Sequence, residues 1–129
     1  MIWFVRYGSR FGFLGLHIVQ PAFRGRGYGL RLWNAGMARL AGRCIGLDGV
    51  AAQQANYRRS GFQLAYRKIR HQGTAGPVFI DMPEPNALAL AMARRHGLTA
   101  AFETARMYAG ECAPRSIERV FGVTSFGLG

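Results

Sequence analysis

Arginine and glycine alternate in a short loop, Arg24-Gly25-Arg26-Gly27-Tyr28-Gly29, which follows an apolar segment and precedes a helical pattern. The first N–H groups of a helix have no internal partners, and the helix dipole places about half a positive charge there. Glycines let an anion approach the backbone closely because no Cβ blocks it. The loop therefore predicts a cradle for a phosphate group, with Arg24 and Arg26 adding charge at its mouth.

Two common phosphate-binding patterns do not fit this loop. A Walker A loop ends in Gly-Lys-Ser/Thr, and a dinucleotide-binding turn needs GxGxxG. Here the glycines stand at positions 25, 27 and 29. A tight strand-to-helix turn without a ligand is the alternative interpretation.

The loop resembles the (Arg/Gln)-x-x-Gly-x-(Gly/Ala) signature of the GNAT superfamily of N-acetyltransferases, and the flanking Val19, Pro21 and Leu30 are similar as well. The resemblance implies a mixed, mostly antiparallel central sheet flanked by helices, an α/β (α+β) fold. It implies that the pantetheine arm of acetyl-coenzyme A pairs with the end of the preceding strand, at Ile18 and Val19. The residues implied to hold the pyrophosphate are Arg24, Gly25, Arg26, Gly27, Tyr28 and Gly29.

Tyr57 is the candidate catalytic residue. The block Tyr57-Arg58-Arg59-Ser60-Gly61-Phe62 resembles a helix end of the family, whose tyrosine in many members protonates the departing coenzyme A thiolate. A phenol with a pKa near 10 can donate a proton to a thiolate of similar basicity. The alternative is that Tyr57 only packs within its helix.

Other polar positions are weaker candidates. Many members carry an asparagine one or two turns before the tyrosine, whereas Asn56 is adjacent to Tyr57, which leaves Gln53 or Gln54 as substitutes. Asp48 and Glu103 are candidates for a general base by residue type alone, and Asp48 is equally a candidate helix cap.

Hydrophobic periodicity and glycine punctuation predict alternating strands and helices, which implies an α/β or α+β sheet. We expect strands over residues 2–5, 13–19, 44–47, 62–69, 78–80, 101–108 and 120–126. We expect helices over residues 29–41, 51–60 and 85–96, each followed by a glycine.

The second half of the chain resembles the last third of two-domain family members. Asn86 matches the helix asparagine, but Ala93 stands where the tyrosine would be, which implies a structural or acceptor-shaping role. We expect residues 1–72 to form the cofactor-binding core and residues 77–129 to be the C-terminal part of a second domain, joined by a polar connector. A composite sheet, completed by strands of the second half, is the alternative to separate halves.

Relative to the family, the sequence begins one or two strands before the loop, so we expect a domain incomplete at its N-terminus. Exposed sheet edges invite pairing with another chain, which predicts a homodimer or an aggregation-prone monomer.

Composition sets further bounds. The 129 residues suit one domain, half are hydrophobic, and the formal charge is +11, all of it within residues 1–70. No apolar run approaches the roughly 18 residues of a membrane span, and no signal peptide is recognisable, so we expect a soluble, cytoplasmic protein without a membrane partner. Cys44 is expected to be a buried thiol, not a disulfide partner of Cys112. The three histidines lack ligand spacing, and no metal site is expected.

Together these features predict an acetyl-CoA-dependent N-acetyltransferase that acts on a primary amine of a small molecule or protein. The alternative is a binding module that holds coenzyme A or nucleic-acid phosphates through its basic half without catalysis. No known nucleic-acid-binding motif supports the nucleic-acid version.

Overall fold

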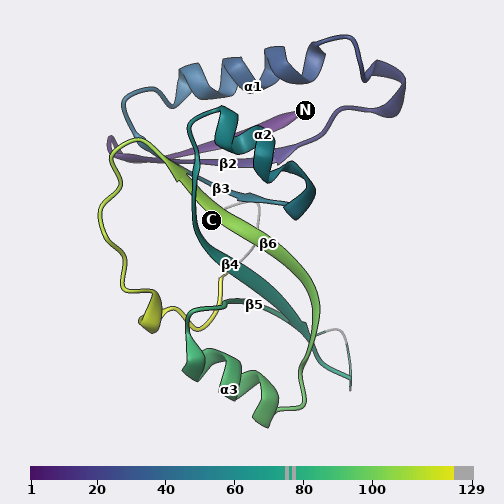
Figure 1. Ribbon diagram of the computed structural model, residues 1–129, viewed down its shortest axis with the longest axis vertical. Helices are drawn as coiled ribbons and strands as arrows, with labels where there is room; N and C mark the ends of the chain where they lie inside the picture. Colours follow the sequence, from purple (N-terminus) through teal and green to yellow (C-terminus); the bar gives the residue numbers. More distant parts are fainter. Residues whose placement is uncertain (75, 77, 124–129) are drawn as a thin grey trace.

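The computed structural model describes residues 1–74, 76 and 78–123. Nine helices and strands among them are joined by short connections (Figure 1). They are β1 (Ile2–Tyr7), β2 (Phe11–His17), α1 (Tyr28–Arg39), β3 (Cys44–Gly49), α2 (Gln54–Arg59), β4 (Gln63–Gln72), β5 (Phe79–Pro83), α3 (Ala87–Arg95) and β6 (Thr99–Ala109). Single turns of 3-10 helix lie at Pro21–Phe23, Ala51–Gln53 and Ile117–Arg119.

The strands form one six-stranded sheet in the order β1-β2-β3-β6-β4-β5. Only β2 and β3 pair in parallel, and the other neighbouring strands are antiparallel. The expected mixed, mostly antiparallel sheet is therefore confirmed. Because β6 lies between β3 and β4, residues 1–72 and 77–129 contribute to the same sheet. Their origin as the ends of two domains stays a prediction.

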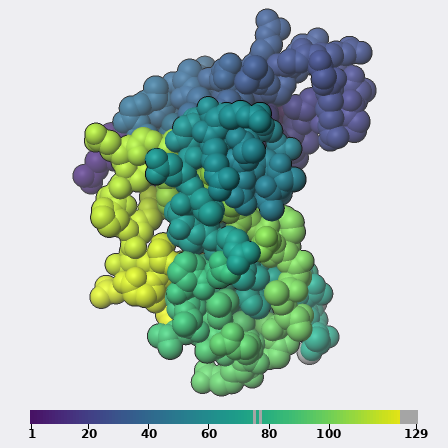
Figure 2. All heavy atoms as spheres, in the orientation of Figure 1, coloured from purple at the N-terminus to yellow at the C-terminus, as the bar shows by residue number. Residues whose placement is uncertain are grey.

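Two hydrophobic clusters hold helices against this sheet. The larger one joins Leu14, Leu47 and Met107 of the sheet to Leu40 and Phe62, beneath α1 and α2. Burial of each large side chain contributes roughly 1.5–3 kcal/mol to folding. The smaller cluster, of Met82, Ala89 and Ala93, seats α3, whose alanines allow close approach to β5. Figure 2 shows α1 and the N-terminal residues at one end of the molecule and α3 at the other.

The chain after β6 is fastened to the sheet at three points. Cys112 forms a disulfide with Cys44, Asn86 donates to the carbonyl oxygens of Glu118 and Val120 at 3.1 and 2.9 Å, and Val123 bridges to Asp81. Asn86 also caps α3 by accepting from the Ala89 N–H. The structural or acceptor-shaping role expected for the second half of the chain stays a prediction.

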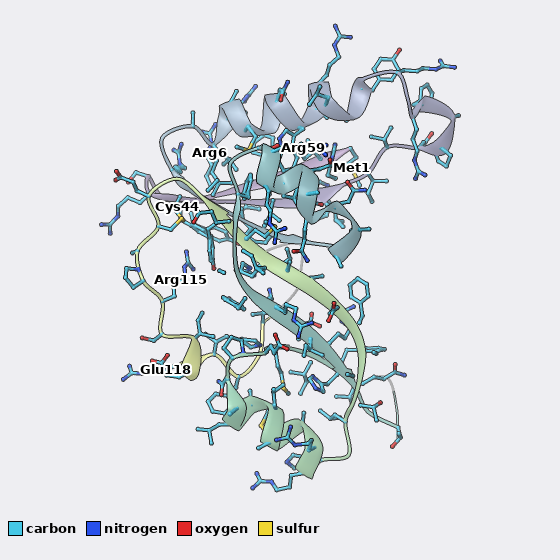
Figure 3. The ribbon with its side chains drawn as sticks, viewed as in Figure 1. Met1, Arg6, Cys44, Arg59, Arg115 and Glu118 are labelled. Atoms are coloured by element: carbon cyan, nitrogen blue, oxygen red, sulfur yellow. A yellow bond between two sulfur atoms is a disulfide. The ribbon has the colours of Figure 1, made fainter. Side chains whose placement is uncertain are left out.

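The expectation of a free Cys44 thiol was wrong. Ile45 pairs with Ala109 in the antiparallel β3–β6 ladder, so the residue before Ile45 and the turn after Ala109 meet at one end of both strands. Sequence separation concealed this proximity, because 68 residues lie between the two cysteines in numbering. Figure 3 shows Cys44 and Arg115 on the side of the molecule along which the chain after β6 runs. Disulfides are rare in the cytosol, and the cytoplasmic location stays a prediction.

Other boundaries differ from the expected ones. The strand β4 continues through His71 to Gln72, so the polar connector begins only at residue 73. The helix expected over 51–60 is a 3-10 turn followed by α2. Of the final strand expected over 120–126, the described part forms only the bridge at Val123, and residues 124–126 lie outside the described residues. Within the described parts of the chain, every helix is too short or too polar to span a bilayer.

Candidate functional site

The central feature of the site is a cleft where β2 and β3 separate. Their parallel pairing runs from Phe11 and Cys44 to Leu14 and Leu47 and stops there. Beyond this point β2 continues from Gly15 to His17, and β3 continues through Asp48 to Gly49, without pairing with each other. A cavity of about 900 Å³ fills the gap, within the usual size of small-molecule sites.

The unpaired strand edges of this cleft offer hydrogen-bond donors and acceptors to a ligand. A β-strand presents N–H and C=O groups that must be satisfied by a neighbour or by solvent. On the side of β3, residues 15–17 have no partner among the described strands, so an extended chain with amide groups could occupy that place.

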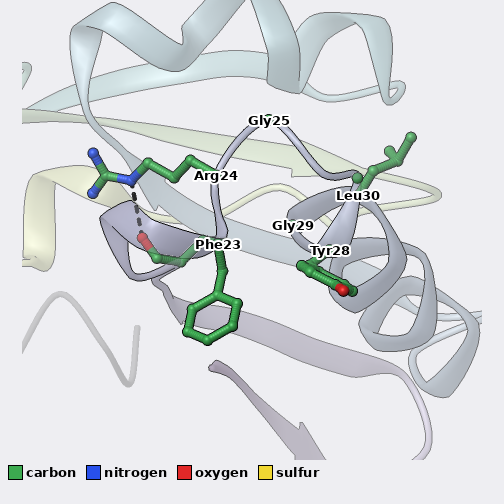
Figure 4. A pocket seen from close by; sticks show the side chains of 8 residues that line it. Phe23, Arg24, Gly25, Tyr28, Gly29 and Leu30 are labelled. Atoms are coloured by element: carbon green, nitrogen blue, oxygen red, sulfur yellow. Dashed lines mark hydrogen bonds between the residues drawn. The ribbon is translucent and has the colours of Figure 1, made fainter.

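The arginine- and glycine-rich loop forms one end of the cleft. Gly25 and Gly27 have φ of 73° and 76°, conformations that favour glycine, and Gly27 caps α1. The first N–H groups of α1 thus face a second hollow of about 280 Å³ (Figure 4). The residues that line it are Val19, Phe23, Arg24, Gly25, Gly27, Tyr28, Gly29 and Leu30.

Most of the predicted cofactor residues meet in these two hollows. Ile18, Val19, Arg24 and Gly29 line the larger one, and all the predicted residues except Ile18 and Arg26 line the smaller. Arg26 lines neither. Arg24 lines both, and its Nε donates to the Val19 carbonyl oxygen at 3.0 Å. That bond anchors the guanidinium beside the loop, as Figure 4 shows.

The strand end differs from the expectation in detail. Ile18 lies beyond β2, and its N–H donates to Met1 O at 2.8 Å while its carbonyl oxygen accepts from Met1 N at 2.7 Å. The open edge of the strand is therefore Gly15 to His17, just before the predicted positions. The expected pairing of Ile18 and Val19 with a pantetheine arm stays a prediction.

Tyr57 faces the cleft from α2. Its ring stacks on Trp33 of α1 with centroids 5.7 Å apart and also lies close to the backbone of Gly49. A Cβ at Gly49 would lie 2.2 Å from Tyr57 Cε2, so only glycine leaves room for the ring. Burial raises the pKa of the Tyr57 phenol above its usual value, which keeps the hydroxyl protonated at neutral pH and able to donate a proton.

Asp48 is not the helix cap that was considered, and its role as a general base stays a prediction. Its carboxylate is buried and accepts hydrogen bonds from Lys68 Nζ at 2.5 Å and from Arg106 Nε and Nη2 at 2.6 and 2.9 Å. It caps no helix, because the 3-10 turn that follows is capped by Val50. Burial, with a smaller effect of Arg106, lowers the pKa of Lys68 to about 8.

Glu103 lies away from the cavity. Its exposed carboxylate pairs with Arg67, 3.3 Å away, and it is not among the residues of either wall. Of the candidates for the role of the helix asparagine, Gln53 and Asn56 both line the large cavity. Asn56 Nδ2 donates a hydrogen bond to Gln53 Oε1 at 2.6 Å. Gln54 is not in the wall.

Several residues of the cavity escaped the sequence reasoning. His17 Nε2 contacts the Gly29 carbonyl oxygen at 3.1 Å, Trp33 stacks on Tyr57, and Phe102 and Thr104 also line the wall. The alternation of Phe102, Thr104 and Arg106 along one strand was the available signal, but it did not reveal which face meets the cleft.

Comparison with known proteins agrees with this geometry. Residues 50–122 match the family described as "Acetyltransferase (GNAT) domain", which is more than half of the chain. The chain belongs to this family, whose members are acyltransferases, and the resemblance inferred from the sequence is confirmed.

Two known proteins are similar to this chain, one in sequence and one in fold. The chain is 38% identical over 69 residues to a holothin acyltransferase of Pseudoalteromonas sp. (strain SANK 73390), covering 54% of this chain and 24% of that protein. The chain thus spans about a quarter of the length of this curated relative. Its fold is similar to the crystal structure of a protein from Pyrococcus horikoshii provisionally described as an acetyltransferase. The TM-score is 0.87 at 14% identity, over 99% of this chain and 75% of the other.

Proposed function

We propose that this chain is an N-acetyltransferase that binds acetyl-CoA between β2 and β3 and transfers the acetyl group to an amine. The observation that carries the proposal is the meeting, in one cleft, of an open strand edge, the N-terminus of α1 and the Tyr57 side chain. Each suits a different part of the cosubstrate. Family membership and the holothin acyltransferase relative support an acyl transfer.

The first turn of α1 and Arg24 would hold the pyrophosphate. Backbone N–H groups and a nearby guanidinium bind phosphate oxygens through charge-assisted hydrogen bonds. The free edge of residues 15–17 would pair with the amides of the pantetheine arm, which directs the thioester along the cleft toward Tyr57.

The chemical step follows from that placement. The amine attacks the thioester carbonyl, backbone N–H groups at the cleft stabilise the oxyanion, and the C–S bond breaks. Tyr57 donates its proton to the leaving thiolate, and the proton lost from the amine nitrogen restores the phenol. The raised pKa of Tyr57 keeps the donor protonated before the step.

Calorimetric titration with acetyl-CoA tests the binding part, with two matched arginine variants. Arg24→Ala removes a cation that lines both hollows, whereas Arg26→Ala removes the same charge from a residue that lines neither. We expect Arg24→Ala to weaken binding about 10-fold or more, as loss of a charge-assisted hydrogen bond does, and Arg26→Ala to change it less than about threefold. Equal losses would point to general charge attraction, and no binding by the folded protein would overturn the proposal.

Tyr57→Phe tests the catalytic part. It deletes one oxygen and keeps the ring that packs on Trp33. Thiol release in the presence of a panel of amines should fall about 10²-fold or more, while acetyl-CoA affinity stays within about twofold. Unchanged turnover would refute the proton-donor role. Acetyl-CoA binding without turnover of any amine would favour the binding-module alternative.

A further inference from the structure

The Thr104 hydroxyl is an unused polar group in the wall of the large cavity. Thr104 is 4% exposed, and its Oγ1 has no hydrogen-bond partner among the residues that the structure describes. Buried hydroxyls are nearly always paired, so an unpaired one at a cavity wall is available to a bound molecule. Neither the proposed proton transfer nor the phosphate cradle makes use of it.

Thr104 lies on the opposite face of the sheet from Tyr57. Its neighbour Ala105 belongs to the hydrophobic core against which Tyr57 packs, and successive side chains of a strand point to opposite faces. Phe102 shares the face of Thr104, lines the same cavity and is 48% exposed. The cavity therefore passes through the gap between β2 and β3, with the Tyr57 side and the Phe102–Thr104 side at its two ends.

The charge of the Phe102–Thr104 end is not negative. Asp48 is the only acidic residue among the described residues of the wall, and the chain's six acidic residues all lie at described positions. Its carboxylate is held by Lys68 and Arg106, so the three groups carry a net positive charge. An ammonium group would be repelled there and would find no carboxylate partner.

We propose that Phe102 and Thr104 form the acceptor end of the cavity and select an uncharged, weakly basic amine on a flat ring, of the arylamine class, over an alkylammonium. The inference rests on the proposed acetyl transfer. The ring stacks near Phe102, and the Thr104 hydroxyl bonds a polar group of the acceptor. A neutral amine needs no carboxylate base before it attacks: its N–C bond forms, the C–S bond breaks, and its proton replaces the one that Tyr57 gives to sulfur.

Two isomeric amines make the test sharp. 4-Methylaniline is neutral at pH 7.5, whereas benzylamine has the same atoms and is mostly protonated. Calorimetric binding of each amine to the protein saturated with coenzyme A, and kcat/KM from thiol release, should both favour 4-methylaniline at least tenfold. Dividing the benzylamine values by its neutral fraction at pH 7.5 separates the supply of neutral amine from true selectivity, at a pH where Lys68 is still mostly protonated.

Thr104→Val and Thr104→Ser test the hydroxyl itself. Thr104→Val should raise the KM for 4-methylaniline at least fivefold with little change in kcat, and Thr104→Ser should restore it. A merely structural hydroxyl would leave KM unchanged, whereas removal of an unpaired one should leave Tm equal or higher. Thr99→Val, on the same strand but outside the cavity wall, is the matched control.

The outcomes separate this inference from the proposed function. If acetyl-CoA does not bind, the proposed function fails. If acetyl-CoA binds and benzylamine is bound or acetylated as well as its isomer, or Thr104→Val leaves the KM unchanged, only the acceptor inference is overturned. Binding of neither amine to the coenzyme A complex also overturns it.

Discussion

Replacing Gly49 by alanine perturbs the site through a single methyl group. An added Cβ would lie 2.2 and 2.7 Å from Cε2 and Cδ2 of Tyr57, and ordinary contacts begin near 3.4 Å. The ring would therefore have to withdraw by about 1.2 Å. It cannot do so freely, because the ring is stacked on Trp33 at a centroid distance of 5.7 Å.

The size of the effect follows from this overlap. Overpacking of a filled core costs about 1–3 kcal/mol. For a domain of this size each kcal/mol lowers Tm by about 4 °C, so we expect a decrease of about 4–12 °C. A displacement near 1 Å of a group that acts on the reacting atoms costs on the order of 10²-fold in turnover, so Gly49→Ala should slow thiol release by about that factor.

Tryptophan fluorescence reports the displacement directly. The chain has two tryptophans, and Trp3→Phe leaves Trp33 as the sole emitter, stacked on Tyr57. In that background Gly49→Ala should shift the emission of Trp33 and lower Tm. Gly73→Ala is the matched control, because its added Cβ would come no closer than 3.3 Å to Leu98, far from the stack in sequence and fold.

Two results would contradict this reasoning. Unchanged emission and Tm would show that Tyr57 does not pack against Gly49. A shifted emission with unchanged turnover per bound acetyl-CoA would show that the position of the Tyr57 ring does not govern catalysis.

Three further predictions concern stability. Replacing Cys44 and Cys112 together by serine should lower the free energy of unfolding, measured in urea, by about 4 kcal/mol, because the disulfide closes a loop over a sequence separation of 68. The wild-type protein under reductant should have the same free energy of unfolding as the variant. Lys68→Met tests the buried cation. The pKa of Lys68 is lowered from 10.5 to about 8, so the unfolded chain binds more protons than the folded protein between these pH values, and the free energy of unfolding of wild type should rise relative to the variant as pH rises from 8 to 10.5. A constant difference across that range would contradict the lowered pKa. Asn86→Ala should lower the free energy of unfolding by about 2–4 kcal/mol, because it removes the cap of α3 and leaves the Glu118 and Val120 carbonyls unpaired. Asn86→Asp keeps the cap and should lower it less. Equal losses for the two variants would show that the cap contributes little.

Much of the fold was predictable because its signals are local. The order of strands and helices follows from apolar periodicity and from glycines that end helices, and these depend on neighbours in sequence. The loop from Arg24 to Gly29 is contiguous, so its motif could be recognised before its shape was known. The candidate role of Tyr57 rested on a similar local block, and the structure adds the Gly49 contact and the Trp33 stack that hold its ring.

The sequence by itself determined most of the elements, the arginine- and glycine-rich loop and the family. The tertiary structure decided which distant residues meet. Insertion of β6 between β3 and β4 places Arg106 beside Asp48, joins Cys112 to Cys44 and brings Thr104 to the cleft. Strand pairing over such separations depends on the total burial and hydrogen bonding of the whole sheet, which no short segment encodes. The charge at the Phe102–Thr104 end of the cavity follows from that strand pairing. The inferred class of acceptor depends on this charge.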